Sequence, residues 1–342
     1  MPAVTLGRTG ITVEKNAFGA LPIQRAETKE AVYILQKAYD HGITFFDTAR
    51  GYTDSESKLG LAFQKVRPNI AIATKTHAST VDAFWKDLEQ SLQNLKTDYI
   101  DIYQFHNPAV VPRPGGENGL YDAALEAKAQ GKIRFIGITN HRLPVAQEAV
   151  ESGLYDSLQF PFSYLSSSKD EALVALCREA HMGFLAMKAL SGGLITNASA
   201  AYAYLAQFDH VLPLWGVQRE RELDDFIGFM AEPPQMTPEI SAQIQQDREE
   251  LAGNFCRGCA YCMPCPAGIE INVAARMSLL LQRSPSQKWL SPEGQEKMER
   301  IDHCLECGSC KAKCPYELDP PAMLKANLKH YRDLIAEKPL SV

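Results

Sequence analysis

The stretch ITFFDT (43–48) carries the first clear signal of the fold, because a short apolar run ends abruptly at Asp47. Seven other short, mainly apolar runs occur in the first 230 residues. They are NAFGAL (16–21), IAIATK (70–75), IDIYQF (100–105), IRFIGIT (133–139), SLQFPF (157–162), GFLAMK (183–188) and VLPLWG (211–216). Continuous rather than alternating hydrophobicity is typical of strands that are covered on both faces, as in a parallel sheet.

Stretches with helical periodicity lie between these runs. In TVDAFWKDLEQSLQNL (80–95), apolar residues recur at steps of three and four, and Thr80 is placed to cap the helix. Similar stretches occupy 28–41, 54–65, 119–130, 143–152, 169–180 and 221–230. Eight such units predict an α/β fold of the (β/α)8 TIM-barrel type. A doubly wound open sheet is the alternative, but its dinucleotide-binding form has a G-x-G-x-x-G turn, which this sequence lacks.

Polar residues follow the predicted strands at the end where barrel enzymes carry their chemistry. In chain order they are Asp47, Tyr52, Lys75, His106, Thr139, Asn140 and Gln159. Because the C-terminal ends of barrel strands surround one opening, we expect these side chains to share a pocket.

Four of these residues form a set that could donate a proton. Tyrosine is a weak acid, with a pKa of about 10, and a nearby ammonium such as Lys75 would lower that pKa. Asp47 would keep the lysine charged, and His106 would bind a carbonyl oxygen beside Tyr52. The set predicts reduction of a C=O group. Taken singly, each residue also has a structural explanation, such as a helix cap for Asp47.

Eight of the nine cysteines lie in two runs near the end of the chain, CRGCAYCMPCP (256–266) and CLECGSCKAKCP (304–315). Three successive C-x2-C steps, or two followed by C-x3-C, suit [4Fe–4S] clusters, and eight thiolates suit two of them. The eight candidate ligands are Cys256, Cys259, Cys262, Cys265, Cys304, Cys307, Cys310 and Cys314. Zinc is the structural alternative, although zinc sites favour separated C-x2-C pairs. Cys177 reads as a core thiol.

The ligands of the two clusters can be divided in two ways. In two-cluster ferredoxins the fourth cysteine of each run binds the other cluster. That rule gives one cluster Cys256, Cys259, Cys262 and Cys314, and the other Cys304, Cys307, Cys310 and Cys265. A local division, with each run binding its own cluster, is the alternative.

The spacing of prolines and apolar residues divides the chain. EPPQMTP (232–238) interrupts the barrel pattern, and helical patterns occupy 271–284, 291–301 and about 320–336. We therefore expect a barrel over 1–235, a linker helix over 236–250, and a small, mainly α-helical domain over 251–342.

Several motifs in the first part resemble those of the aldo-keto reductase family. GITFFDTARGYTDSESKLG (42–60) is similar to the family signature, and ATKT (73–76), QFHN (104–107), GITN (137–140) and LQFPFSYL (158–165) resemble further family segments in order and spacing. The resemblance implies a catalytic tetrad of Asp47, Tyr52, Lys75 and His106. It also implies that Thr139, Asn140 and Gln159 contact the nicotinamide of NAD(P)H. The cysteine region resembles α-helical ferredoxins, and the combination resembles an iron–sulfur subgroup of the family.

Two departures concern the nucleotide. Met187 stands where the family often has the tyrosine that stacks on the nicotinamide. In WGVQRERELDDFIG (215–228), Gly216 and Arg219 fit the adenosine-phosphate segment, but Glu222 replaces a usual arginine and Phe226 a usual asparagine. A carboxylate would repel a 2′-phosphate. This change favours NADH, or weak nucleotide binding, over NADPH.

Composition excludes several classes of function. The net charge of −6 argues against a nucleic-acid surface. No apolar stretch reaches the length of a membrane span, and no signal peptide is apparent. The expectation is a cytoplasmic protein that acts on a small carbonyl or alcohol.

Three hypotheses of function follow from the combination. The first is an aldo-keto reductase-type oxidoreductase that uses NAD(P)H together with two [4Fe–4S] clusters. The second is an electron-transfer protein whose barrel binds a redox partner, and the third is a redox sensor. The intact tetrad counts against the second hypothesis, and the altered nucleotide segment counts for it.

Overall fold

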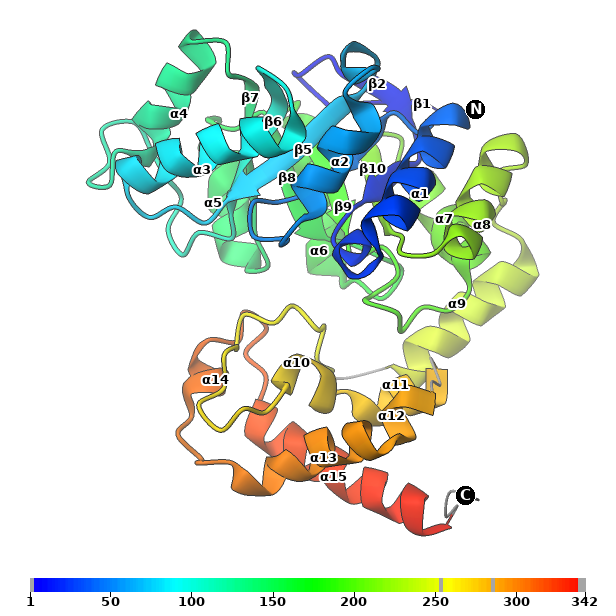
Figure 1. Ribbon diagram of the computed structural model, residues 1–342. Coiled ribbons are helices and arrows are strands. Elements are labelled where there is room, and N and C mark those ends of the chain that lie inside the picture. Colours follow the sequence, from blue (N-terminus) through cyan, green and yellow to red (C-terminus); the bar gives the residue numbers. More distant parts are fainter. Residues whose placement is uncertain (1–2, 252–254, 284–286, 338–342) are drawn as a thin grey trace. The chain divides into compact units, whose positions relative to one another are not determined.

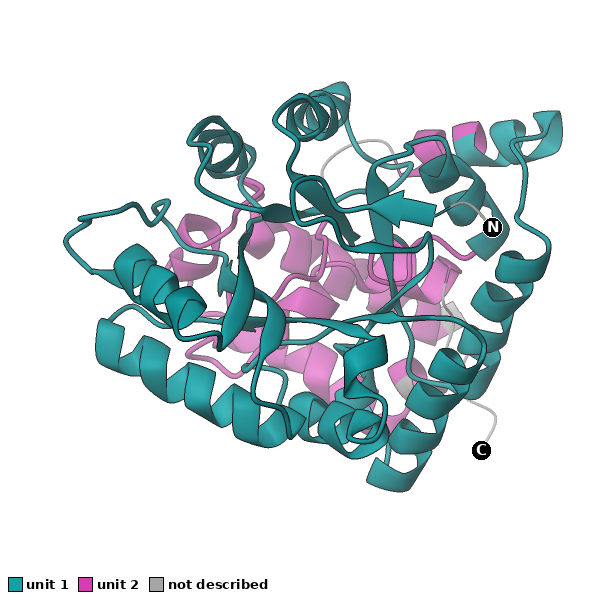
Figure 2. Cartoon of the chain, turned by 90° about the horizontal axis from the view of Figure 1, so that it is seen from above, with its two compact units in different colours: residues 1–189, 198–244 teal, residues 190–197, 245–342 magenta. Residues whose placement is uncertain are grey.

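The computed structural model describes residues 3–251, 255–283 and 287–337. By contact, the chain divides into two compact units (Figures 1 and 2). The first comprises Met1–Ala189 and Ala198–Ile244, and the second comprises Leu190–Asn197 and Gln245–Val342. A segment from within the barrel sequence thus belongs to the second unit.

The first unit is a closed parallel barrel of eight strands, in the order β10-β3-β4-β5-β6-β7-β8-β9. The strands are β3 (Ala17–Gly19), β4 (Phe45–Asp47), β5 (Ala71–Thr76), β6 (Ile100–His106), β7 (Ile133–Thr139), β8 (Ser157–Pro161), β9 (Gly183–Met187) and β10 (Val211–Gly216). Each lies within two residues of its predicted run. The (β/α)8 prediction is therefore confirmed, and the open-sheet alternative is wrong.

Helices surround the barrel (Figure 1). They are α1 (Thr28–Asp40), α2 (Ser55–Phe63), α3 (Val81–Leu95), α4 (Leu120–Ala129), α5 (Leu143–Glu151), α6 (Ser168–Glu179), α7 (Ala198–Ala206) and α8 (Glu220–Ala231), with 3-10 turns η1 (Pro22–Arg25) and η2 (Arg67–Asn69). Thr80 caps α3 as predicted, since its side chain accepts a hydrogen bond from the Ala83 N–H. The sequence patterns missed α7, whose alanine-rich composition shows little amphipathic contrast.

A hairpin that the sequence patterns also missed precedes the barrel. Strands β1 (Ala3–Thr5) and β2 (Thr12–Glu14) pair antiparallel. Val4 and Val13 of the hairpin pack in one buried apolar cluster with Phe45 and Ala71, the first residues of β4 and β5. The hairpin thus packs against the N-terminal strand ends, which leaves the C-terminal ends to form the site.

The second unit is mainly helical. It contains part of α9 (Pro238–Glu250), α10 (Ile271–Ala274), α11 (Met277–Arg283), α12 (Gln287–Leu290), α13 (Pro292–Glu299), η3 (Arg300–His303), α14 (Ser309–Ala312) and α15 (Pro320–Glu337). The single helix predicted over 271–284 is wrong, because the helix is interrupted at Ala275 and Arg276, between α10 and α11. Ser284 lies outside the described residues. Among the described helices, none combines the length and apolar character of a membrane span.

Candidate active site and metal centre

The barrel register brings the predicted tetrad together at neighbouring strand ends. Asp47 is the last residue of β4, Lys75 lies near the end of β5, and His106 is the last residue of β6. Tyr52 lies in the loop after β4, before α2. Because these strands are adjacent and parallel, the four side chains approach the same opening of the barrel.

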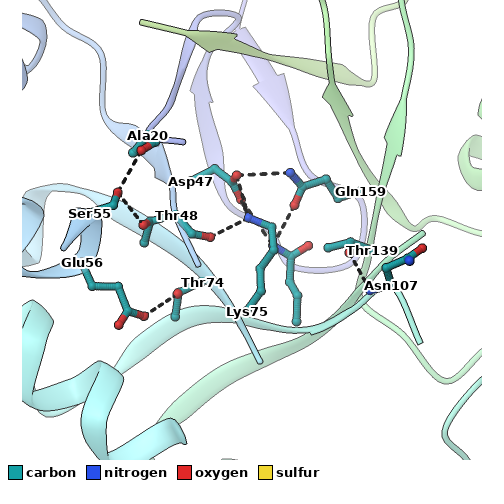
Figure 3. Close-up of polar contacts among 11 residues, drawn as sticks. Ala20, Asp47, Thr48, Ser55, Glu56, Thr74, Lys75, Asn107, Thr139 and Gln159 are labelled. Carbon is teal, nitrogen blue, oxygen red and sulfur yellow. Dashed lines mark hydrogen bonds and ion pairs between the residues drawn. The ribbon is translucent and has the colours of Figure 1, made fainter. Parts of the chain in front are cut away.

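A buried ion pair forms the base of the site (Figure 3). Lys75 Nζ donates to both carboxylate oxygens of Asp47 at 2.7 Å and to the Thr48 carbonyl at 2.5 Å. Lys75 and Asp47 are 1% and 4% exposed. All three N–H donors of the ammonium therefore have acceptors, and Lys75 can act on the site only through its charge.

Two glutamine amides complete the bonding of the Asp47 carboxylate. Gln159 Nε2 donates to Asp47 Oδ2 at 3.2 Å, and Gln104 Nε2 lies 3.4 Å from Asp47 Oδ1 and 3.0 Å from Gln159 Oε1. Gln104 was not predicted as a site residue. It pairs in register with Lys75, and a glutamine inside the apolar run IDIYQF was the signal that could have identified it.

Burial acts in opposite directions on the two charged partners. It lowers the pKa of Lys75, and the Asp47 carboxylate opposes that change. Burial raises the pKa of Asp47, and Lys75 and both glutamines oppose that change. A buried ion pair adds little to the stability of the fold compared with apolar side chains of similar size. Removal of one partner, however, leaves an unpaired buried charge and lowers the stability by about 3–5 kcal/mol.

Tyr52 and His106 lie against this base. Lys75 Nζ is 5.2 Å from the centre of the Tyr52 ring, and the Tyr52 and His106 rings meet edge to face with centres 5.9 Å apart. The structure therefore brings together all four predicted tetrad residues. A positive charge beside a phenol favours the phenolate form, which is what a tyrosine acid requires after it gives up its proton.

His77 is a further site residue that sequence reasoning missed. Its ring stacks on His106 with centres 3.9 Å apart and planes 16° apart. Burial holds the pKa of His106 well below its usual range, and His77, Lys75 and His141 lower that pKa further. His106 is consequently a neutral imidazole at neutral pH, able to donate a hydrogen bond but not to act as a strong acid.

The three residues expected to contact nicotinamide are engaged within the protein. Asn140 donates to the Pro108 carbonyl at 2.9 Å and accepts from the Arg142 N–H at 2.8 Å. The Thr139 hydroxyl accepts from the Asn107 N–H at 3.0 Å. Gln159, opposite Thr139 in register, bonds to Asp47 and Gln104 as described above. These bonds fix the orientation of the three side chains, and each amide nitrogen still has a second N–H that it can donate.

The other predicted nucleotide contacts lie at or beyond the ends of two strands. Met187 ends β9 and is half-buried, Gly216 ends β10 and is exposed, and Arg219 precedes α8. Glu222 Oε2 accepts the N–H groups of Gln218 and Arg219 at 2.8 and 3.1 Å. Its carboxylate thus caps the N-terminus of α8.

Phe226 has become part of the core. It is 3% exposed and stacks on Trp215 with ring centres 4.4 Å apart and planes 16° apart. In this buried position the phenylalanine is unavailable to a ligand.

The eight clustered cysteines line two hollows of the second unit. One hollow is lined by Cys256, Cys259, Cys262 and Cys314. The other, larger hollow is lined by Cys262, Cys265, Cys304, Cys307 and Cys310. Each hollow thus contains the four cysteines of one crossed set, and only Cys262 borders both.

A contact between the two runs accompanies this division. The Arg257 guanidinium, beside Cys256, lies 5.0 Å from the centre of the Tyr316 ring, two residues beyond Cys314. Among the described residues, no group of three or more His, Cys, Asp or Glu side chains is arranged to hold a single metal ion. A [4Fe–4S] cluster needs no such group, since its four thiolates each bind a different iron.

Cys177 lies apart from the hollows. It is fully buried on α6, and burial raises the pKa of its thiol to about 12. The interpretation of Cys177 as a core thiol fits this environment.

Sequence comparison assigns both parts of the chain. Residues 15–239 match the aldo/keto reductase family, and residues 255–319 match a 4Fe-4S dicluster domain. The chain therefore belongs to the aldo/keto reductase family, a family of oxidoreductases, and carries a C-terminal iron–sulfur domain. The predicted combination is confirmed.

Individual relatives agree with this assignment. An uncharacterized oxidoreductase of Bacillus subtilis is 29% identical over 206 residues, which are 56% of this chain and 66% of the relative. The NADH-specific methylglyoxal reductase of Escherichia coli is 28% identical over 228 residues, which are 58% of this chain and 70% of that enzyme. The chain thus spans about two thirds of the length of these curated relatives.

Solved structures share the barrel. An aldo-keto reductase of Bacillus halodurans superposes with a TM-score of 0.63 at 21% identity, covering 72% of this chain and 96% of the other. An aldo-keto reductase of Klebsiella pneumoniae in complex with NADPH gives 0.62 at 20% identity, covering 71% and 94%. At these identities the likeness establishes the fold.

Proposed function

We propose that the protein interconverts a small carbonyl compound and its alcohol, with Tyr52 as general acid and base and NAD(P)H as hydride source. The observation that carries the proposal is the buried Lys75–Asp47 pair whose positive end lies 5.2 Å from the Tyr52 ring. The cost of burying this ammonium is offset by Asp47, whose carboxylate is in turn bonded by Gln104 and Gln159, and the positive charge lies close to the phenol ring.

The protein groups divide the proton chemistry between them. The substrate oxygen lies between the Tyr52 hydroxyl and the neutral His106 imidazole, which donates a hydrogen bond. As hydride adds to the carbonyl carbon, the Tyr52 proton passes to the carbonyl oxygen, and the charge of Lys75 stabilises the phenolate that remains. In alcohol oxidation the same phenolate takes the proton back.

The cysteine hollows fit the second part of the proposal. Cys256, Cys259, Cys262 and Cys314 would bind one [4Fe–4S] cluster, and Cys265, Cys304, Cys307 and Cys310 the other. When bound, nicotinamide supplies a two-electron hydride and each cluster transfers one electron, so that a pair of clusters matches one hydride. A redox protein is then the expected electron partner.

The nucleotide is expected to be NADH rather than NADPH. Glu222 fills the N-terminus of α8 with a negative charge, close to Gly216 and Arg219, where the family binds the adenosine phosphate. The NADH-specific relative from Escherichia coli supports NADH and a reactive 2-oxoaldehyde as the first pair of compounds to test.

Glu222→Gln is expected to raise the affinity for NADPH several-fold relative to NADH. The amide can still accept the two backbone hydrogen bonds, but the charge that opposes a 2′-phosphate is gone, and charge at a helix end is worth about 0.3–1 kcal/mol. Dissociation constants for both nucleotides, measured by fluorescence, check this result. Glu220→Gln is the matched control, since Glu220 is on the same helix but pairs with Lys37. An equal gain in both variants would indicate a general effect of net charge.

Anaerobic titration of the cluster-loaded protein with NADH tests the proposal as a whole. We expect the visible absorbance of the clusters to bleach, because a nucleotide site that communicates with them delivers its electrons. If dithionite bleaches the clusters and neither NADH nor NADPH does, nucleotide is not the source of the clusters' electrons, and the proposed coupling between the nucleotide site and the clusters is incorrect.

A second function is favoured by the nucleotide segment. Because Glu222 and Phe226 are both committed to the protein's own structure, the barrel could serve instead as a platform for a redox partner or sensor. In that case the clusters would exchange electrons with a protein, and Tyr52 would have no catalytic role.

A further inference from the structure

We propose that Arg276 tunes the reduction potential of the cluster bound by Cys256, Cys259, Cys262 and Cys314. The inference rests on the proposed assignment of two clusters. It concerns a residue outside both cysteine runs, at the point where the helix predicted over 271–284 breaks into α10 and α11.

The Arg276 guanidinium lies directly over the first cysteine turn. Gly258 stands between Cys256 and Cys259 with a φ of +62°, and a Cβ added there would lie 2.8 Å from Cζ of Arg276 and 3.1 Å from both of its terminal nitrogens. Only glycine permits this approach, since any side chain would collide with the guanidinium. The half-buried charge of Arg276 is thereby fixed beside the cluster ligands.

The same turn carries a second feature that acts in the same direction. The Gly258 N–H donates to the Sγ of Cys256 at 3.4 Å. Hydrogen bonds to cluster sulfurs and nearby positive charge both stabilise the reduced state, because reduction adds negative charge. The Arg276 guanidinium lies against Gly258, whose N–H makes this hydrogen bond. Its positive charge therefore adds to the stabilisation of the reduced state that the turn already provides.

Arg276 is fixed in place by a segment far away in the sequence. Its Nη1 donates to the Gly192 carbonyl at 3.0 Å, and a Cβ on Gly192, whose φ is +66°, would lie 2.9 Å from that nitrogen. Gly192 belongs to the segment Leu190–Asn197, which lies between the end of β9 and the start of α7. The guanidinium thus lies between two glycines, one in each segment.

A neighbouring arginine provides a matched comparison. Arg283 Nη1 donates to the Leu194 carbonyl of the same segment at 3.0 Å, and Nη2 pairs with Asp247 and Glu250 at 2.7 Å. It anchors the segment as Arg276 does, but the three atoms nearest to a Cβ built on Gly258, in the first cysteine turn, all belong to Arg276. If both arginines only held this segment in place, replacing either one should have the same effect on the cluster.

The test is an anaerobic redox titration of the full-length, cluster-loaded protein, followed by electron paramagnetic resonance. Arg276→Gln is expected to make the first cluster roughly tenfold harder to reduce, which is a fall of about 59 mV in its midpoint potential. Arg276→Lys, which keeps the charge, should restore most of the potential, and Arg283→Gln should leave it unchanged. The signals of the two clusters are assigned by comparison with Cys265→Ser.

Several outcomes would overturn the proposal. One is an unchanged potential in Arg276→Gln with full iron content, and another is an equal fall in Arg283→Gln. If Arg276→Gln loads incompletely, Arg276→Met is measured in its place; loss of the first cluster in both neutral variants would assign Arg276 to folding of the turn. Iron content below about eight per chain in the unmodified protein would instead refute the two-cluster assignment.

Discussion

Tyr52→Phe is expected to lower the rate of carbonyl reduction roughly 100- to 10,000-fold, the usual contribution of a positioned general acid. The ring remains to pack against His106 and Lys75, so the fold and the ion pair below it should persist. Only the transferable proton is lost. Steady-state turnover of a small aldehyde, with nucleotide binding measured on the same sample, checks the expectation.

The control for this substitution is Tyr121→Phe. Tyr121 lies on α4, and its hydroxyl donates to the Leu154 carbonyl away from the strand ends. Tyr121→Phe also removes a phenolic hydroxyl, but from a residue outside the site. The turnover of this variant should equal that of the unmodified protein. If Tyr52→Phe retained full turnover, Tyr52 would not be the general acid. That result would support the hypothesis that the barrel is a platform for a redox partner.

The second large effect concerns the cysteines. Cys265→Ser is expected to remove the cluster whose other ligands are Cys304, Cys307 and Cys310, although Cys265 lies in the first run. Iron would fall from about eight to about four atoms per chain. The physical reason is the position of Cys265 in the larger hollow, beside those three residues. Iron analysis with visible spectroscopy on anaerobically prepared protein gives the result.

Cys314→Ser is the reciprocal variant. Cys314 lines the hollow of Cys256 and Cys259, so its loss should remove that cluster and spare the other. The two single variants should therefore have similar iron content but different spectra, and the double variant should bind no cluster. If each single variant lost the cluster of its own run, ligation would be local and the crossed set would be wrong.

The barrel was accessible from the sequence because each strand is short and apolar and, except for β9, is followed by a helix of clear periodicity. The positions of Asp47, Lys75 and His106 followed from the rule that barrel chemistry lies at strand ends. The hairpin of β1 and β2 was not accessible, since each of its strands has a single buried residue and so shows no apolar run. Helix α7 was missed because alanine at most positions conceals the buried face.

Partner choice within the site could not be predicted. The sequence shows that Asn140 and Gln159 are polar residues at strand ends, but not that their amides are committed to Pro108, Arg142, Asp47 and Gln104. Likewise, Glu222 was expected to repel phosphate, but its capping of the Gln218 and Arg219 N–H groups depends on the rotamer in the folded chain. Contacts between residues far apart in sequence, such as Arg276 and Gly192, leave no local pattern.

The segment Leu190–Asn197 has a consequence for how the chain is made. A ribosome adds roughly 5–20 residues per second, so this segment emerges several seconds before Arg276 and Arg283, whose guanidinium groups bond to its carbonyls. During that interval the nascent barrel has one loop without its final partners. The same dependence means that a gene truncated at Ile244 would encode a barrel with an orphaned loop. The two compact units are therefore not simply consecutive along the gene, since the second includes a segment encoded within the barrel sequence.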